Sequence, residues 1–314
     1  MNSSARGMKV LITGASGFVG RNLILRAPKD WEITALYSQD ISFPGFVSKS
    51  SLANVSPCQV DLNSPDQIRS AMEKRGREWD CCLHLAAKVD IPWSVDNPKL
   101  DLLANTASTL NLLEEVRVGR FVYLSSGAVY DGLCGQVDPS MPVYPTLPYA
   151  VSKLTSEEYV RAFWRRRKSI ERYCIVRFFG AFGPYEAAHK IYGRLVRRFG
   201  IEKQSDYELY GDGSNLIDAM YIDDAVGALL LIANDPRDLT IDLAGGNPIS
   251  LEQLVVEAAS TFGIESLNLK KSGIAHESNA FWGSPEGMSL QYGFRPTVSL
   301  ASGLKKFCEF LLRS

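Results

Sequence analysis

Long apolar runs and an excess of one charge are both missing from this chain of 314 residues. The longest apolar runs, such as AVGALLLIA at 225–233, are well short of a membrane span, and the first residues, MNSSARG, lack the apolar core of a secretory signal. The 34 basic and 35 acidic residues nearly cancel, so no overall field attracts nucleic acid or an anionic membrane. We therefore expect a soluble protein that binds neither.

Cysteine and histidine are too scattered to predict a metal site. The six cysteines form no CxxC pair, and His84, His189 and His276 show no mutual metal-ligand spacing. Several cysteines lie in strand-like apolar runs, where a reduced thiol packs well. We expect no metal, a cytoplasmic location, and a structural role for His84 in its apolar strand.

Short β-like runs alternate with helical stretches through the first half of the chain, which is typical of parallel βαβ units. Strands are predicted at 8–13, 32–37, 57–62, 81–87, 120–126, 173–180 and 240–246, and helices near 149–168, 189–199, 222–234, 250–262 and 299–312. The sequence therefore predicts an α/β fold, a doubly wound parallel (Rossmann) sheet with a smaller C-terminal substrate-binding lobe.

Two segments rich in Gly, Pro and Ser, at 180–215 and 263–298, interrupt this alternation and predict the second lobe. We expect a dinucleotide-binding domain at 1–179 plus about 214–249, and a substrate-binding lobe at 180–213 plus about 250–314. The basic segment 161–172 could bind nucleic acid, but at the end of a predicted helix it is more typical of a solvated face that complements the helix dipole.

The segment TGASGFVG at 13–20 directly follows the first predicted strand and leads into a helix. In this context Gly14 permits a tight turn, Gly17 lets the backbone approach a pyrophosphate, and Gly20 allows the helix to pack closely on the strand. The helix N-terminus adds unpaired N–H groups. A glycine-rich turn without a ligand is the alternative, but the spacing favours a dinucleotide.

The residues that choose between NAD and NADP are ambiguous. An acidic residue about 20 positions after the glycines usually bonds the adenosine ribose. Here Tyr37 and Ser38 end the second strand, Asp40 comes late, and no clear arginine stands beside them. The cofactor is therefore NAD or NADP. Asp61 is placed to meet the adenine amino group, or alternatively to cap a helix.

The stretch YAVSK at 149–153 begins a helix that follows a proline-rich loop. Residues four apart on a helix are neighbours, so Tyr149 and Lys153 can share one site. The alternatives are a buried aromatic residue and a surface charge.

Together these motifs resemble the extended short-chain dehydrogenases/reductases, specifically the group of nucleotide-sugar epimerases, dehydratases and reductases. The resemblance covers nearly the whole chain and rests on the order of its motifs: TGASGFVG, VDL at 60–62, HLAAKVDIPWSVDNP at 84–98, Asn105 within NTASTLNLLE, YLSSGAVYDG, PYAVSK, VRFFGAFGPY, GDGSNLIDAMYIDDAV and YGFRPTVSLASGL.

The resemblance implies a role for each residue of the pair and adds a third residue. A tyrosine with its ordinary pKa of about 10 is a poor base at neutral pH unless a cation stabilises its phenolate. Tyr149 is implied as the general acid/base, Lys153 as that cation and a ligand of the nicotinamide ribose, and Ser126 as the partner of the reacting oxygen, with Ser125 as the neighbouring alternative. Cofactor contacts are implied for Gly14, Ser16, Gly17, Phe18, Val19, Gly20, Ser38, Asp61, Leu62, Leu85, Ala86, Ala87, Lys88, Asn105, Tyr149, Lys153 and Phe179.

The implied chemistry is oxidation of a sugar hydroxyl, in which Tyr149 takes the proton and hydride passes to the nicotinamide. A dehydratase of this family usually carries an Asp-Glu pair directly after its Ser or Thr, whereas this chain has Gly127 and Ala128, so dehydration is disfavoured. We expect an epimerase, with a nucleotide-sugar 4-ketoreductase as the alternative. A cofactor-sensing binding protein on the same fold is a more remote alternative.

Departures from the family pattern concern the substrate. Gly180 replaces a usual Asn, and Ile217 stands where an Arg is usual. Arg194 and Arg198, with Lys190 and Arg197 nearby, could replace the lost diphosphate contact, or they could be solvated. Ser126, Gly127, Gly180, Arg194 and Arg198 are the expected substrate contacts. The expected partners are a nucleotide-diphosphate sugar and a second copy of the chain, because many relatives form homodimers through helices equivalent to about 98–117 and 149–168.

Overall fold

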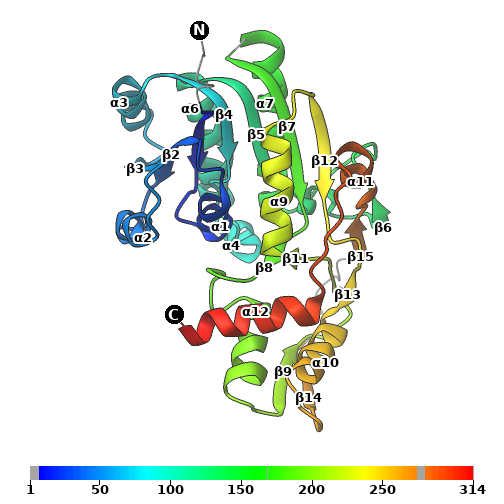
Figure 1. The fold of residues 1–314 in the computed structure, drawn as a ribbon. Helices are drawn as coiled ribbons and strands as arrows, with labels where there is room; N and C mark the ends of the chain where they lie inside the picture. The colour runs from blue at the N-terminus through cyan, green and yellow to red at the C-terminus, as the bar shows by residue number, and fades with distance from the viewer. Residues whose placement is uncertain (1–6, 168, 274–279, 314) are drawn as a thin grey trace. The chain divides into compact units, whose positions relative to one another are not determined.

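Seven strands form the main sheet of the computed structural model, which describes residues 7–167, 169–273 and 280–313. They are β1 (Lys9–Thr13), β2 (Glu32–Tyr37), β3 (Val55–Gln59), β4 (Glu78–His84), β5 (Arg117–Ser126), β7 (Ile170–Phe178) and β12 (Leu239–Leu243), in the order β12-β7-β5-β4-β1-β2-β3 (Figure 1). The pairs β1–β2, β1–β4, β2–β3 and β4–β5 are parallel. The strand order reverses at β1, which confirms the predicted doubly wound Rossmann sheet.

The strands follow the apolar runs, and their ends follow polar residues. In β1, the side chains of Val10, Leu11 and Ile12 are 0% exposed, as expected for a strand covered on both faces. The predicted strand at 57–62 is wrong at its end: β3 stops at Gln59, because Asp61 turns the chain with its own side chain. The strand predicted at 81–87 instead begins at Glu78 and ends at His84.

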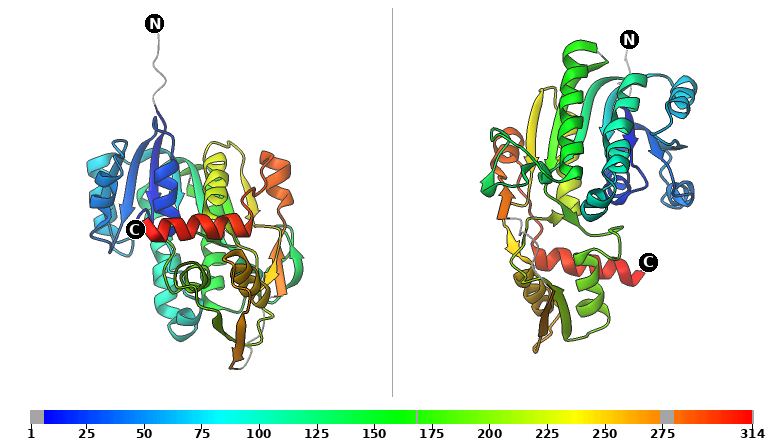
Figure 2. Two further views of the ribbon diagram at one scale, coloured as in Figure 1. Left: turned by 60° about the horizontal axis from the view of Figure 1, so that its bottom comes forward. Right: turned by 180° about the vertical axis from the view of Figure 1, so that it is seen from behind.

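The helices of this part of the chain cover the sheet on both faces. α1 (Phe18–Arg26) lies in front of the sheet in Figure 1, and α7 (Pro148–Ala162) lies in front of it in the reversed view of Figure 2. α7 begins with Pro148, whose missing N–H costs nothing at this position. The α-helix ends at Ala162 and continues as a π-helical turn at Phe163–Arg167, so the helix predicted near 149–168 is confirmed as far as Arg167, and its last residue lies outside the described residues.

The other helices and turns that accompany the sheet are α2 (Phe43–Lys49), α3 (Pro65–Arg75), α4 (Ile91–Asp96), α5 (Pro98–Leu102), a π-helical turn at Leu103–Ala107, α6 (Ser108–Glu115) and a 3-10 turn at Gly127–Tyr130. Residues from α3, β4, β5, α6 and α7 share one apolar cluster, which includes Ile68, Trp79, Phe121 and Val160. This core sets the position of α7 relative to β5.

The chain divides into two compact units. The first holds the residues up to Asp131, with Val143–Arg177 and Leu229–Ile241; the second holds Gly132–Pro142, Phe178–Ala228 and the residues from Asp242 onward. Three segments that were predicted for the dinucleotide-binding domain thus group with the second unit instead: 132–142, 214–228 and 242–249. The expected domain boundaries remain a prediction, because compactness does not test which part binds cofactor or substrate.

Small two-stranded sheets and short helices make up the second unit. The sheets pair β6 (Cys134–Val137) with β15 (Ala280–Gly283), β8 (Ala181–Phe182) with β11 (Met220–Tyr221), β9 (Asp206–Tyr210) with β14 (Asn268–Ser272), and β10 (Leu216–Ile217) with β13 (Ile249–Ser250). The rings of Phe182 and Tyr192 stack at 4.2 Å within its core. The helices are α8 (Ile191–Leu195), a π-helical turn at Val196–Ile201, α10 (Leu251–Thr261), α11 (Glu286–Tyr292) and α12 (Leu300–Arg313).

Three predicted helices agree with the structure within one residue at each end. These are α9 (Ile222–Ala233), α10 and α12, predicted at 222–234, 250–262 and 299–312. α10 begins at a capping box in which Ser250 and Gln253 bond each other's backbone N–H groups. Within the described residues, no helix has both the length and the apolar character needed to cross a membrane.

Candidate active site

The turn between β1 and α1 has the shape that a phosphate cradle needs. Gly14 has φ +65°, and a Cβ there would lie 2.7 Å from the backbone N of Ala86. A Cβ on Gly20 would lie 2.4 Å from the carbonyl oxygen of Gly14, so the helix packs directly on the turn. Gly17 precedes α1 without a side-chain cap, which leaves N–H groups of the first turn available to an anion.

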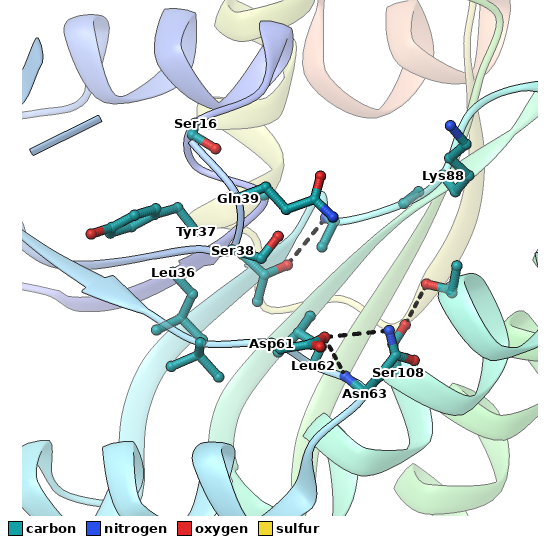
Figure 3. Close-up of a pocket in the computed structure, with 16 residues that line it drawn as sticks. Ser16, Leu36, Tyr37, Ser38, Gln39, Asp61, Leu62, Asn63, Lys88 and Ser108 are labelled. Carbon is teal, nitrogen blue, oxygen red and sulfur yellow. Dashed lines mark hydrogen bonds between the residues drawn. The ribbon is translucent and has the colours of Figure 1, made fainter. Parts of the chain in front are cut away.

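A cavity of about 430 Å³ opens beside this turn in the first unit (Figure 3). Its walls include eight of the expected cofactor residues: Gly14, Ser16, Ser38, Asp61, Leu62, Ala86, Ala87 and Lys88. The lining also contains Thr13, Leu36, Tyr37, Gln39, Val60, Asn63, Ala104 and Ser108, which the sequence analysis did not name as contacts. Most of these residues end a parallel strand or directly follow one, and that rule could have found them.

The other expected cofactor residues lie outside the lining of this cavity. Gly17, Phe18, Val19 and Gly20 form the start of α1, and Leu85 precedes two lining alanines. Phe179 belongs to the second unit. A cavity lined by both apolar and polar residues, beside a turn with N–H groups available to an anion, nevertheless fits a dinucleotide, with its phosphates toward the turn.

The end of β2 carries neutral polar groups. Ser38 and Gln39 line the cavity, and the carbonyl of Ser38 accepts a hydrogen bond from Gln59. Asp40 forms an ion pair with Arg21 of α1 and accepts hydrogen bonds from Ser42. Asp40, the acidic residue that follows β2, is therefore already paired, and the cofactor is NAD or NADP.

Asp61 turns the chain beside the cavity. Its carboxylate accepts the backbone N–H of Asn63 at 2.9 Å, and its own N–H donates to the side chain of Gln67. The alternative reading as a helix cap is wrong, because Ser64 caps α3 by accepting the N–H of Gln67.

The structure brings Ser126 and Tyr149 together. Ser126 ends β5, its hydroxyl accepts the N–H of Ala128 at 3.1 Å, and its side chain is close enough to Tyr149 to lower the pKa of the phenol. Ser125, the alternative, donates instead to the buried carboxylate of Glu157 at 2.6 Å. Of the two serines, Ser126 is thus the one beside the tyrosine.

Lys153 lies one helical turn from Tyr149 and is 2% exposed. Its ammonium donates to the carbonyl of Leu124 at 2.6 Å and lies 4.4 Å from the centre of the Tyr123 ring. These contacts hold the lysine against β5, on the strand that also carries Ser126.

Burial dominates the pKa values of this pair. It raises the pKa of Tyr149 to about 12, with the hydrogen bond from Ser126 acting downward and the charge of Asp101 acting upward. It lowers the pKa of Lys153 to about 7, against the upward pull of Glu157 and Asp101. In the protein by itself the lysine directs its ammonium to Leu124, and its role as the cation that stabilises the Tyr149 phenolate stays a prediction.

Asn105 is committed to protein partners. Its amide accepts the N–H of Lys88 at 2.8 Å and donates to the Lys88 carbonyl at 3.2 Å and to Asp101 at 2.8 Å. It lies in the π-helical turn, with Ala104 and Ser108 on the cavity side. The amide thus fixes the backbone of Lys88, a residue that lines the cavity.

The expected substrate residues fall in both units. Gly127 is buried at the start of the 3-10 turn. Gly180 has φ +123°, a backbone that only glycine adopts easily, which explains why the usual Asn is absent. In the second unit, Arg198 pairs with Asp206, which favours a structural role, whereas Arg194 lies 5.5 Å from the centre of the Tyr207 ring.

A buried ion cluster behind the pair escaped the sequence analysis. Glu157 is 0% exposed and accepts hydrogen bonds from Arg177 at 2.9 Å and 3.1 Å, from Arg161 at 3.2 Å, and from Ser125. The sequence could have indicated Glu157, because it lies four residues after Lys153 and therefore on the same face of the helix.

Comparisons with known proteins agree with this arrangement. The family described as "NAD dependent epimerase/dehydratase family" matches residues 10–242. A putative UDP-glucose 4-epimerase of Methanocaldococcus jannaschii is 24% identical over 96% of this chain and 98% of its own length. A dTDP-glucose 4,6-dehydratase of Mycobacterium tuberculosis is 28% identical over 73% of this chain and 70% of its own.

A solved structure shares the fold. The UDP-glucuronic acid 4-epimerase of Bacillus cereus, solved with UDP-glucuronic acid and NAD, superposes with a TM-score of 0.84 and 22% identity, covering 98% of this chain and 99% of its own. The match over 10–242 confirms the resemblance drawn from the motifs and the expectation of an enzyme with a nicotinamide cofactor. This chain belongs to the NAD dependent epimerase/dehydratase family.

Proposed function

We propose that the protein is a nucleotide-sugar epimerase that oxidises a sugar hydroxyl to a ketone and reduces it again. The observation that carries this proposal is that Ser126, Tyr149 and the buried Lys153 lie together, in the unit that also contains the glycine turn. We assign cofactor binding to the first unit and the nucleotide part of the substrate to the second, with Arg194 as its diphosphate contact.

Each side chain of the pair has a defined task in this proposal. The oxidised nicotinamide, when bound, supplies a hydride acceptor and a positive charge. Tyr149 takes the hydroxyl proton on its phenolic oxygen and later returns it to the ketone oxygen. Ser126 hydrogen-bonds the same sugar oxygen, and Lys153 keeps a positive charge close to the phenolate as it forms.

The residues after Ser126 argue against dehydration. Gly127 and Ala128 carry no ionisable group that could move a proton at the neighbouring sugar carbons. The N–H of Ala128 is also committed to the Ser126 hydroxyl. The ketone formed at the site would therefore be reduced rather than dehydrated.

Turnover without added reductant tests the proposal. The purified protein, given NAD or NADP but no reduced cofactor, is incubated with UDP-glucose, UDP-glucuronic acid or dTDP-glucose, and the sugar products are identified by NMR. We expect an epimer from at least one of them, and a loss of about 100-fold or more in rate for Tyr149→Phe. No epimer in this assay, together with stoichiometric consumption of NAD(P)H when it is supplied with a 4-keto-sugar nucleotide, would indicate the ketoreductase instead, and full activity of Tyr149→Phe would refute both.

We propose further that two copies of the chain form a dimer through α5, the π-helical turn and α7. The support is a set of exposed apolar side chains on these elements, Leu100, Leu102, Leu103, Val151 and Tyr159, which are 40–51% exposed. Leu103→Glu should yield a monomer by light scattering, whereas Leu290→Glu, at an 82% exposed leucine of α11, should not. A wild-type monomer at micromolar concentration would refute the dimer.

We place the protein in the cytoplasm. All six cysteines are free thiols, and Cys81, Cys82 and Cys174 are buried in the sheet, as suits a reducing compartment. Fractionation of the producing cells tests this location.

A further inference from the structure

Asp101 is a carboxylate buried in the protein interior close to the proposed catalytic pair. It lies in α5 and is 0% exposed. One oxygen, Oδ1, accepts the amide of Asn105 at 2.8 Å, and Oδ2 has no hydrogen-bond partner among the described residues. A buried carboxylate with a free oxygen is costly, so its presence calls for an explanation beyond packing.

The backbone places Asp101 against the segment that carries Tyr149 and Lys153. α5 and the π-helical turn both pack on α7. Thr106 donates to the carbonyl of Ser152 at 3.0 Å, and this bond fixes the turn beside the residue before Lys153. The N–H of Tyr149 donates to Ser94 of α4 at 3.2 Å, so the start of α7 is also held on this side.

The charged and titratable groups around Asp101 are few. From α7 they are Tyr149, Lys153 and, one turn further, Glu157; the π-helical turn carries none, and Lys99 of α5 and Asp96 of α4 are exposed. On the strand side of Lys153, Tyr123 of β5 and His84 of β4 are both buried without charge, since burial raises the pKa of Tyr123 and lowers that of His84. The charge of Asp101 therefore acts mainly on Tyr149 and Lys153.

We propose that Asp101 is a positioning residue whose buried carboxylate sets the charge state of the Tyr149–Lys153 pair. This inference rests on the proposed function of that pair. The negative charge keeps Lys153 in its ammonium form in spite of burial, and it makes the Tyr149 phenolate a stronger base toward the sugar hydroxyl. Asn105 holds the carboxylate in place and ties it to the backbone of Lys88, which lines the cofactor cavity.

A titration of Lys153 tests the proposal without any substrate. Protein labelled with 13C at lysine Cε is titrated by NMR, and Lys153→Met identifies the signal. The wild-type midpoint is expected near the pKa of about 7. In Asp101→Asn it should fall by about one pH unit, because a nearby negative charge is lost. Asp96→Asn removes an exposed charge close in sequence and should leave the midpoint unchanged.

The pH dependence of kcat/KM tests the effect on catalysis. Because the charge of Asp101 acts on both Tyr149 and Lys153, its loss should move both limbs of the profile to lower pH. Glu157→Gln, which removes a charge that acts on Lys153, should move one limb. A lower rate with unmoved limbs would mean that Asp101 is only structural and would overturn the inference.

The melting temperature of the variants also separates a purely structural role of Asp101 from a role in setting the charge of the pair. A purely structural Asp101 predicts that Asp101→Asn melts at a lower temperature, whereas removal of a costly buried charge predicts an equal or higher melting temperature. Asp101→Ala removes the same charge without an amide and should shift the Lys153 midpoint equally. If no sugar nucleotide is turned over, the proposed function fails, but the NMR titration still decides the role of Asp101. An unchanged Lys153 midpoint in both Asp101→Asn and Asp101→Ala would overturn the inference about Asp101.

Discussion

A methyl group added at Gly14 should lower the stability of the fold, whereas one added at Gly17 of the same turn should weaken only cofactor binding. Gly14→Ala places a Cβ 2.7 Å and 2.8 Å from the N and Cα of Ala86, both backbone atoms, at φ +65°. Gly17→Ala places a Cβ whose nearest neighbour is the Gly14 carbonyl oxygen at 3.2 Å, at an ordinary φ of −76°. The fold thus requires glycine at 14 and tolerates alanine at 17.

The expected magnitudes follow from these contacts. For Gly14→Ala, the left-handed backbone costs about 1–2 kcal/mol and the displacement of packed backbone about 1–3 kcal/mol, so we expect a loss of about 3 kcal/mol in unfolding free energy. For Gly17→Ala, the weaker helix cap and the stiffer unfolded chain nearly cancel, so the change should stay within about 0.5 kcal/mol. If Gly17 admits a pyrophosphate, its methyl should weaken cofactor binding by about tenfold or more, equivalent to about 1.4 kcal/mol.

Urea unfolding and fluorescence titration with NADH and NADPH measure the two quantities separately. The expected pattern is an unstable Gly14→Ala protein and a stable Gly17→Ala protein that binds both cofactors poorly. Wild-type affinity in Gly17→Ala would refute the assignment of this turn as a phosphate cradle. Wild-type stability in Gly14→Ala would show that the close approach to Ala86 is not required.

Three further predictions concern buried polar groups. Burial lowers the pKa of His84 from 6.5 to about 3, so below pH 6.5 the unfolded chain takes up a proton that the folded protein excludes. In urea unfolding, the free energy of unfolding should therefore fall as the pH drops below 6.5, by up to about 1.4 kcal/mol per pH unit, and His84→Gln should flatten this slope. Arg177→Met should cost about 3–5 kcal/mol by leaving Glu157 buried with fewer partners, and adding Glu157→Gln should recover much of it in thermal melts; equal melting of the single and double variants would contradict this reasoning. Asp224 accepts the N–H and hydroxyl of Thr297, so Asp224→Asn should cost about 1–3 kcal/mol and speed hydrogen exchange at that N–H.

Local patterns explain why much of the fold was predictable. The parallel strands are buried on both faces and read as apolar runs, and helix starts carry recognisable signals such as Pro148 and the Ser250 cap. The errors in the predicted strands lie at the strand ends, where a single side chain can determine where the strand stops. Asp61 ends the third predicted strand early by turning the chain, a competition that an apolar pattern does not register.

The candidate site was predictable where its chemistry is local. The glycine spacing of 13–20 and the four-residue interval between Tyr149 and Lys153 are both written in one short stretch of chain. The pKa values of Tyr149 and Lys153 were not predictable in the same way, because they depend on burial and on groups from other elements.

The sequence by itself determined the family, the sheet and the two local motifs, because periodicity and spacing act within a few residues. Only the tertiary structure decided which of Ser125 and Ser126 meets Tyr149, and it alone revealed Glu157 and Asp101 as the charges around Lys153. Those choices depend on packing between β5, α5 and α7, which are far apart in the chain, and no local pattern encodes the solvent exclusion that makes their charges matter.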